Sequence, residues 1–241
     1  MALTPPLLRL ERVAFGYADG TPILSDVSYC LDAPRLVAIS GPNGGGKSTL
    51  LRLIAGLLTP SRGDIELLGG TVSQQRHRLG YVAQHPTLQA DTPLSVRDIV
   101  AQGRLDARWW RRLGRNDHAR IDEALAALQI TELQGRTPRS LSGGQRQRML
   151  IARALAANPD MLLLDEPCAH LDRAGGDALM ATLAALAQRL PILMVTHDLE
   201  QAWPHLGELL HVERCLSRRS LTLPDIHPTA HPTAHREAGH R

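Results

Sequence analysis

Residues 41–49 read Gly-Pro-Asn-Gly-Gly-Gly-Lys-Ser-Thr, and this stretch decides the fold. It fits the G-x-x-x-x-G-K-[ST] pattern of a phosphate-binding loop in full. The apolar residues 36–40 before it indicate a short buried strand, and residues 48–56 after it indicate a helix that ends at a glycine. In this order, loop N–H groups and the positive end of the helix surround a phosphate chain. The predicted phosphate site consists of Gly41, Pro42, Asn43, Gly44, Gly45, Gly46, Lys47, Ser48 and Thr49.

Lys47 is the only lysine in the chain, and the other residues of the Lys/Arg class are all arginine. A genome biased towards arginine codons explains why the other basic residues are arginine. The exception at position 47 indicates that arginine cannot replace lysine there. A compact ammonium lies along the β- and γ-phosphates, whereas a planar guanidinium is bulkier and sits differently. Ser48 is expected to ligate Mg²⁺ and Thr49 to reach a phosphate.

A second anion site is predicted further along the chain. Residues 146–156 have helix formers with apolar positions at helical spacing. Ser142 is a natural N-cap, and the two glycines after it leave the first helical N–H groups uncovered. Two such chains arranged head to tail would let each Ser-Gly-Gly end close over the nucleotide of the other. The residues of this second site are Ser142, Gly143, Gly144 and Gln145.

Together these motifs resemble those of the ATP-binding cassette (ABC) ATPases, in which residues 141–145 match the signature motif that acts in trans. The resemblance extends over about residues 7–213. It implies an α/β fold with a RecA-like parallel core, an N-terminal antiparallel β-subdomain and a helical subdomain that carries the signature. ATP and Mg²⁺ are the implied cofactors, and ATP hydrolysis is the implied activity.

The resemblance also assigns roles to two adjacent carboxylates. Residues 161–164 indicate an apolar strand that ends in Asp165 and Glu166, as in a Walker B motif. Because side chains alternate along a strand, the two carboxylates diverge and can do different work. By resemblance, Asp165 holds Mg²⁺ through its waters and Glu166 polarises the attacking water.

Four further residues match motifs of the family. Asp172 matches the D-loop, which contacts the opposing protomer, and His197 matches the switch histidine, which contacts the γ-phosphate and helps to position the water. Gln84 matches the Q-loop, which senses Mg²⁺ and the water and links the site to a membrane partner. Tyr17 matches the aromatic that stacks on adenine, although an aromatic near the start of a chain is often only part of the core.

The chain differs from the usual motif residues of the family at three positions. Ala83 precedes the glutamine where proline is frequent, Cys168 stands where threonine or phenylalanine is usual, and His170 lies within the D-loop. None of these positions supplies a phosphate or Mg²⁺ contact. Cys168 and His170 have no second pair of ligands, so we do not expect a separate metal site there.

The composition excludes several other classes of protein. No apolar run approaches the ~18 residues that cross a bilayer, and we find no secretory signal at the start of the chain. A formal charge of +3 and an aromatic content of 3% argue against a nucleic-acid partner. The three cysteines match neither a disulfide framework nor a zinc ribbon, so a reduced, cytosolic setting is expected. They are Cys30, Cys168 and Cys215.

We expect an ABC ATPase domain at residues 7–222, with the helical subdomain at about 93–157, and a His/Pro-rich flexible tail at 223–241. The tail repeats a four-residue unit with a proline in each copy, which prevents a helix. Weak binding of metal ions and a neutral extension both remain open for it. Trp109 and Trp110 could contact a membrane subunit or lipid headgroups, or could equally pack locally.

The short stretch at residues 69–84 is similar to cassettes of zinc and manganese importers, and the His-rich tail favours the same choice. The leading hypothesis is therefore the ATPase subunit of a divalent-metal importer. We expect it on the cytoplasmic side of the membrane, paired head to tail with a second copy, bound to integral permease subunits and served by a periplasmic or lipoprotein metal-binding protein. The alternatives are the ATPase of a siderophore, haem or cobalamin importer, a soluble ABC ATPase without transport, and a nucleotide-binding regulator without turnover.

Overall fold

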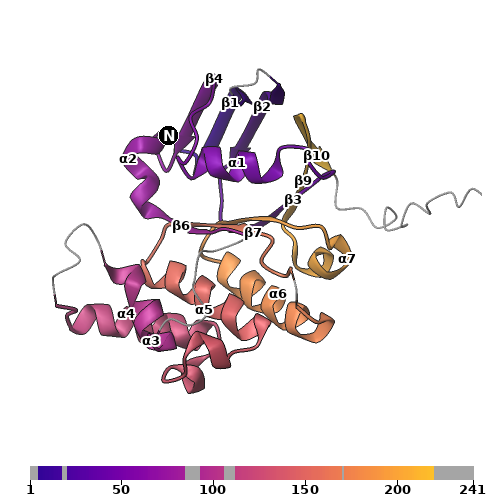
Figure 1. Ribbon diagram of the computed structural model, residues 1–241. Coiled ribbons are helices and arrows are strands. Elements are labelled where there is room, and N and C mark those ends of the chain that lie inside the picture. Colours follow the sequence, from indigo (N-terminus) through magenta and orange to yellow (C-terminus); the bar gives the residue numbers. More distant parts are fainter. Residues whose placement is uncertain (1–4, 18–20, 85–92, 106–111, 170, 220–241) are drawn as a thin grey trace, which may run out of the picture.

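The computed structural model describes residues 5–17, 21–84, 93–105, 112–169 and 171–219. Its strands form two sheets (Figure 1). The antiparallel sheet has the order β2-β1-β4-β5, and the second, six-stranded sheet has the order β10-β9-β3-β8-β7-β6. In the second sheet β9, β3, β8, β7 and β6 are parallel, and β10 pairs antiparallel with β9 at the edge.

The strands of the antiparallel sheet are β1 (Leu8–Gly16), β2 (Pro22–Leu31), β4 (Arg62–Leu67) and β5 (Gly70–Thr71). Those of the six-stranded sheet are β3 (Leu36–Ser40), β6 (Leu79–Val82), β7 (Met161–Asp165), β8 (Ile192–Val195), β9 (Glu208–Glu213) and β10 (Cys215–Arg219). The helices are α1 (Lys47–Ile54), α2 (Val72–Gln75), α3 (Val96–Ala101), α4 (Arg115–Ala127), α5 (Gly143–Ala156), α6 (Arg173–Ala187) and α7 (Leu199–Ala202).

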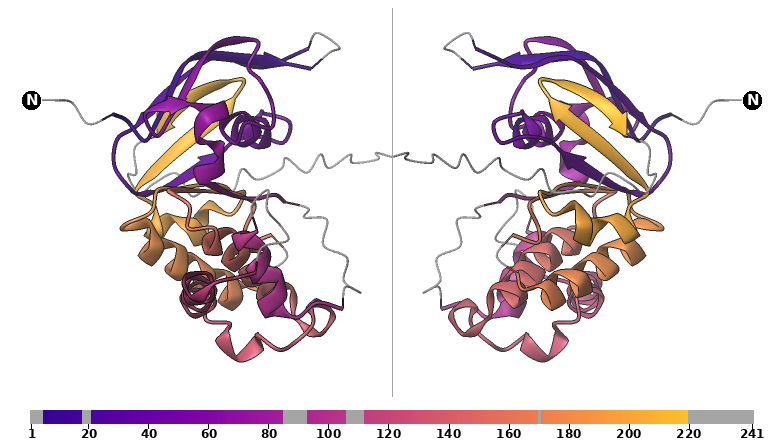
Figure 2. Two further views of the ribbon diagram at one scale, coloured as in Figure 1. Left: turned by 90° about the vertical axis from the view of Figure 1, so that its left-hand side faces the viewer. Right: turned by 90° about the vertical axis from the view of Figure 1, so that its right-hand side faces the viewer.

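The parallel strands are buried on both faces, which explains their continuous apolar runs. In β3, Val37 and Ile39 belong to a core shared with the antiparallel sheet and α1. Leu36 and Ala38, on the opposite face of the same strand, belong to a second core that is shared with α3, α4, α5 and α6. The side views show the same layers, with the antiparallel sheet and α1 on one side of the parallel sheet and the long helices on the other (Figure 2). The expected fold class is confirmed.

A buried glutamate connects the two sheets at one edge. The Tyr29 hydroxyl of β2 donates to Glu208 Oε2 of β9 at 3.0 Å, and Arg218 Nε of β10 lies 2.5 Å from Glu208 Oε1. Arg35 adds a contact of 3.4 Å to the same carboxylate. Burial, reinforced by the neighbouring Glu208 carboxylate, raises the pKa of Tyr29. The phenol therefore stays protonated and keeps donating across the junction.

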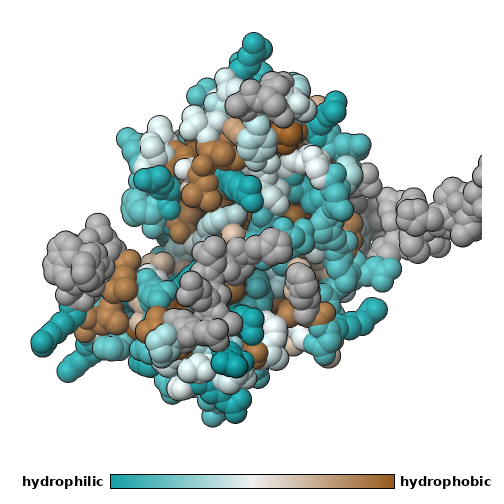
Figure 3. Space-filling view, in the orientation of Figure 1, coloured by the Kyte–Doolittle hydropathy of each residue, from teal (hydrophilic) through white to brown (hydrophobic). Residues whose placement is uncertain are grey.

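Polar side chains cover most of the face in Figure 3, but apolar ones gather in two places. One lies where Figure 1 shows α1 and α2, and the other lies near α3 and α4. Among the described residues, Leu57 is the most exposed large hydrophobic side chain, at 59%, and Leu105 is 41% exposed. Exposed apolar surface of this kind suits contact with another protein more than contact with water.

Candidate functional site

The loop between β3 and α1 is shaped by glycines that no other residue could replace. Gly41 has φ +142°, and a Cβ there would lie 2.1 Å from the Val212 carbonyl oxygen of β9. Gly46, the N-cap of α1, has φ +99°, and its Cβ would lie 2.6 Å from Leu24 Cδ2. Both positions combine a backbone that disfavours side chains with a close neighbour. The loop is thereby fixed in place at the positive end of α1, as an anion site requires.

Lys47 is the first residue of α1 and is only 6% exposed. Its ammonium folds back over the loop and donates to the carbonyl oxygens of Gly41 and Pro42, at 2.9 and 2.8 Å. Burial lowers the pKa of Lys47, while the carboxylates of Glu166 and Asp165 act in the opposite direction. The ammonium is held at the mouth of the loop, where phosphate oxygens can compete with the carbonyls for its protons.

Asp165 ends β7 beside the start of α1 and is 1% exposed. Ser48 Oγ donates to Asp165 Oδ1 at 2.9 Å, which joins two elements 117 residues apart. Burial raises the pKa of Asp165, and the hydrogen bond from Ser48 opposes that shift. Hydroxyl and carboxylate oxygens are the hard ligands that Mg²⁺ prefers, so this pair fits a magnesium ion.

Glu166 follows β7 directly and adopts φ +53°, a left-handed backbone that is rare for a residue with a side chain. Its N–H donates to the Val195 carbonyl of β8 at 3.1 Å, which stabilises this turn. One carboxylate oxygen accepts from Gln84 Nε2 at 2.7 Å, and the other lies 2.7 Å from His197 Nε2. The strained turn thus aims the carboxylate between the two predicted partners, as often occurs at functional sites.

Lys47, Ser48 and the Glu166 group with Gln84 and His197 line one open cleft with a volume of about 750 Å³, and Asp165 lies buried behind Ser48. Every residue lining it belongs to the predicted nucleotide site: Asn43, Gly44, Gly45, Lys47, Ser48, Thr49, Gln84, Glu166 and His197. The cleft lies at the carboxyl ends of β3, β7 and β8, where ligands bind in parallel α/β sheets. It offers phosphate donors, hard oxygen ligands and a carboxylate suited to orient water.

The predicted second anion site occupies the N-terminus of α5 and does not line the cleft of its own chain. Ser142 accepts from the Gln145 N–H at 3.2 Å, while Gln145 Oε1 accepts from the Ser142 N–H at 3.1 Å. This capping box leaves Ser142 and Gly143 exposed to solvent. Asp172, the exposed N-cap of α6, lies close by, since a Cβ on Gly144 would come 3.4 Å from the neighbouring Leu171. The signature and D-loop residues therefore share one surface.

Several predicted residues lie outside this arrangement. Tyr17 is 45% exposed, packs edge-on against Phe15 at 5.1 Å between ring centroids, and is not among the residues that line the cleft, so its adenine contact stays a prediction.

Within the described residues no cluster of three or more His, Cys, Asp or Glu could hold a metal ion. Burial raises the pKa of the Cys168 thiol to about 11, with Asp198 and Asp177 adding to the effect. Outside the described residues lie His170, Trp109, Trp110 and the tail at 223–241.

Sequence reasoning missed Arg52, which lies one helical turn after Ser48 on α1. Its charge acts on Asp165, and its side chain interacts with the hydroxyl of Tyr81, three residues before Gln84. The signal was available, since positions four apart share a face of a helix. Arg52 thus connects the phosphate-loop helix to β6, the strand that precedes Gln84.

The sequence of this chain is similar to those of known proteins. A family model described as "ABC transporter" matches residues 24–169. The high-affinity zinc uptake system ATP-binding protein ZnuC of Bacillus subtilis is 36% identical, with 86% of this chain and 91% of the relative covered. The manganese transport system ATP-binding protein MntB of the same organism is 39% identical, with 81% and 78% covered.

Among solved structures, cbiO1 from Clostridium perfringens, part of the ABC transporter complex cbiONQ, is similar to this chain. The two superpose with a TM-score of 0.79 at 29% identity, covering 88% of this chain and 87% of cbiO1. Among the described residues, no helix is long and apolar enough to cross a membrane.

Proposed function

This chain belongs to the ABC transporter family, and we propose that it is the ATP-hydrolysing subunit that powers import of a divalent metal ion such as zinc or manganese. The arrangement of Glu166 carries the proposal. Its carboxylate lies between Gln84 and His197, in the same cleft as the phosphate loop. A cleft that only bound nucleotide would not need a carboxylate aimed at the γ-phosphate end of the loop.

The residues divide the work of hydrolysis among them. The loop N–H groups and Lys47 bind the phosphates, and the ammonium exchanges its carbonyl partners for phosphate oxygens. Glu166 orients the attacking water and accepts its proton, which is typically worth about 10²–10⁴ in rate. His197 and Gln84 hold the Glu166 carboxylate and contact the γ-phosphate side of the cleft. Ser48 and Asp165 would hold Mg²⁺, which when bound neutralises charge on the β- and γ-phosphates.

The exposed Ser142 end of α5 supports a head-to-tail pair of identical chains. Its N–H groups form an anion site that does not face the cleft of its own chain. In a two-fold pair, each Ser142 end covers the nucleotide in the cleft of the other chain, and Asp172 lies at the same junction. ATP then joins the two chains, and hydrolysis with phosphate release separates them.

The names of the relatives support the proposed cargo and permease partners. Both curated relatives are named for metal uptake or transport, one for zinc and one for manganese. Integral permease subunits would carry the metal across the membrane, with this chain bound at their cytoplasmic side through the Gln84 region. A periplasmic or lipoprotein metal-binding protein would deliver the metal. The relatives favour this cargo over siderophores, haem and cobalamin.

Transport by the assembled complex tests the proposal. The chain is purified in complex with the permease subunits proposed above and reconstituted in vesicles with the capture protein. We expect ATP-dependent uptake of radioactive zinc or manganese, lost in Glu166→Gln and unchanged in Glu213→Gln, an exposed glutamate outside the cleft. ATP-driven uptake of a metal chelate, with no uptake of the free ion, would contradict the proposed cargo.

A further inference from the structure

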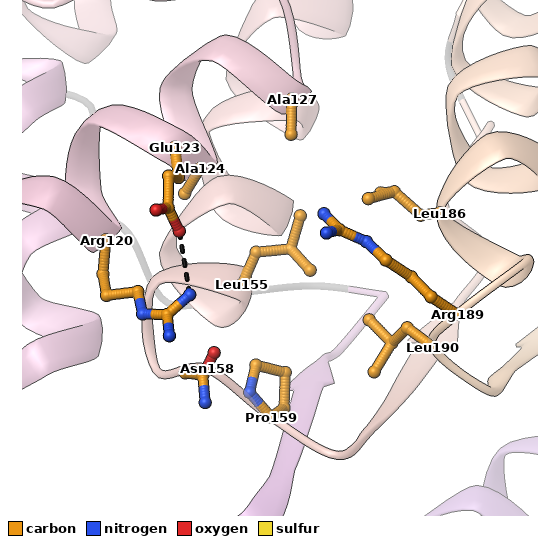
Figure 4. Close-up of a pocket in the computed structure, with 10 residues that line it drawn as sticks. All are labelled: Arg120, Glu123, Ala124, Ala127, Leu155, Asn158, Pro159, Leu186, Arg189 and Leu190. Atoms are coloured by element: carbon orange, nitrogen blue, oxygen red, sulfur yellow. Dashed lines mark hydrogen bonds and ion pairs between the residues drawn. The ribbon is translucent and has the colours of Figure 1, made fainter.

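A second pocket lies among the helices on the far side of the parallel sheet, between α4, the end of α5 and the end of α6 (Figure 4). It has a volume of about 230 Å³ and shares no residue with the nucleotide cleft. The apolar part of its lining is formed by Ala124, Ala127, Leu155, Pro159, Leu186 and Leu190, and polar side chains form the rest. The proposed ATPase activity makes no use of this pocket.

The rim of the pocket has unequal charges. Arg120 Nη1 donates to Glu123 Oε2 at 2.9 Å, so these two charges balance each other. Arg189 extends over the pocket from the α6 side (Figure 4). Among the described residues, its guanidinium has no hydrogen bond or ion pair. With the amide of Asn158 also on the rim, the pocket presents one unbalanced positive charge above an apolar wall.

This combination selects a class of ligand. A cationic ligand would be repelled by Arg189. A dianion such as phosphate carries more negative charge than one guanidinium can balance, and it would lose its hydration where it packs against the leucines, which costs free energy. A carboxylate matches a single guanidinium in charge and geometry. Since apolar cavities of roughly 150 Å³ hold benzene, a pocket of this size takes a ligand of about eight or nine non-hydrogen atoms.

We propose that this pocket binds a carboxylate that carries a short branched aliphatic group. The carboxylate pairs with Arg189, and the aliphatic group packs on Leu155, Leu186 and Leu190. A free aliphatic carboxylic acid and the C-terminal leucine of a peptide present the same chemistry. Leu155 belongs to the last turn of α5, and Pro159 lies two residues before β7. Because Ser142 caps the other end of α5 and Asp165 ends β7, the bound ligand would stabilise the chain between the two elements that bear the nucleotide-facing groups.

The test uses the full chain with ¹³C-labelled leucine methyl groups and titrates 4-methylpentanoate, its neutral amide, acetate, and a short peptide ending in leucine. We expect 4-methylpentanoate or the peptide to shift the methyl signals of Leu155, Leu186 and Leu190. The amide and acetate should bind at least tenfold more weakly. Binding of the free acid identifies a small carboxylate as the source, and binding of the peptide alone identifies a chain terminus.

Variants separate this site from general binding to arginine. Arg189→Met should weaken binding at least tenfold, and Arg189→Lys should retain part of it. Arg115→Met, at an exposed arginine of α4 that does not line the pocket, should leave binding unchanged. Ala127→Phe fills the pocket and should abolish binding with the charge intact. Equal binding by Arg189→Met, equal binding of the amide, or no methyl shift with any ligand overturns the proposal.

Discussion

At the nucleotide cleft the functional side chains contact residues from distant parts of the chain, whereas at the N-terminus of α5, in the part of the chain that the structure describes, the Ser142 and Gln145 side chains bond only to each other's backbone N–H groups. Lys47 contacts the loop carbonyls, and Ser48 contacts Asp165. Glu166 contacts both Gln84 and His197. The Ser142 hydroxyl, in contrast, is hydrogen-bonded among the described residues only to Gln145 of its own helix end. The first region fits a site that acts on its own ligand, and this contrast supports our proposal that the second region meets a ligand bound by another copy of the chain.

Lys47→Ala is expected to have the largest effect, on ATP affinity, and it tests the first side of this comparison, the nucleotide cleft. The variant loses two charge-assisted contacts to phosphate, each worth about 1.5–3 kcal/mol, so ATP affinity should fall by about 100-fold or more and hydrolysis with it. Binding of a fluorescent ATP analogue measures the loss. Lys47→Arg should fail as well, because the guanidinium does not fit between the loop carbonyls and the phosphates. A variant that bound ATP normally would show that the loop does not depend on its lysine.

Glu166→Gln should separate binding from hydrolysis at the same cleft. The amide cannot accept a proton from water, so the hydrolysis rate should fall by about 10²–10⁴ while ATP remains bound. Single-turnover hydrolysis and ATP retention through gel filtration measure the two quantities. The Glu213→Gln variant, changed at an exposed strand residue, serves as the control. Loss of ATP binding together with hydrolysis would mean that Glu166 holds the cleft together instead of acting on water.

A smaller effect, on stability, is expected at the opposite end of α5. Arg104 Nε donates to the buried Asp117 Oδ1 at 2.9 Å, and Arg104 Nη1 contacts the carbonyls of Ala156 and Ala157 that end α5. Breaking a buried ion pair costs about 3–5 kcal/mol, and Arg104→Met should reach the lower end because its side chain is 20% exposed.

Urea unfolding monitored by circular dichroism measures that loss. Arg120→Met is the matched control, since it breaks an exposed pair on the same helix that is worth at most about 1 kcal/mol. Equal destabilisation by the two variants would contradict the anchoring role of Arg104. ATP affinity should change little in either variant, which would confirm that the end of α5 positions the signature surface and not the cleft.

The sequence predicted the parts of the cleft whose signals are local. The strand at residues 36–40, the loop after it and the apolar run before Asp165 each combine a motif with a buried pattern. Contacts between distant segments were beyond such reasoning. The Gln84–Glu166 hydrogen bond joins residues 82 apart, and the place of β6 beside β7 depends on how the whole sheet pairs.

Two further features escaped prediction for the same reason. The left-handed backbone at Glu166 is stabilised by its hydrogen bond to Val195 on a neighbouring strand. Glutamate has no intrinsic preference for this conformation, so the sequence does not predict it. The pairing of Arg104 with Asp117 requires that a turn and the start of α4 meet the end of α5. Tertiary packing, which local sequence patterns do not encode, decides both.

A mixing experiment tests most directly whether each working site is built from two chains. Lys47→Ala and Ser142→Arg are purified separately, each is shown to be inactive in hydrolysis, and the two are combined at a concentration that permits pairing. In a head-to-tail pair of the two variants, one site carries both changes and the other carries neither, so we predict that ATP hydrolysis returns on mixing. If one chain held a complete site, every cleft in the mixture would carry a change, and hydrolysis would stay as low as in either variant alone.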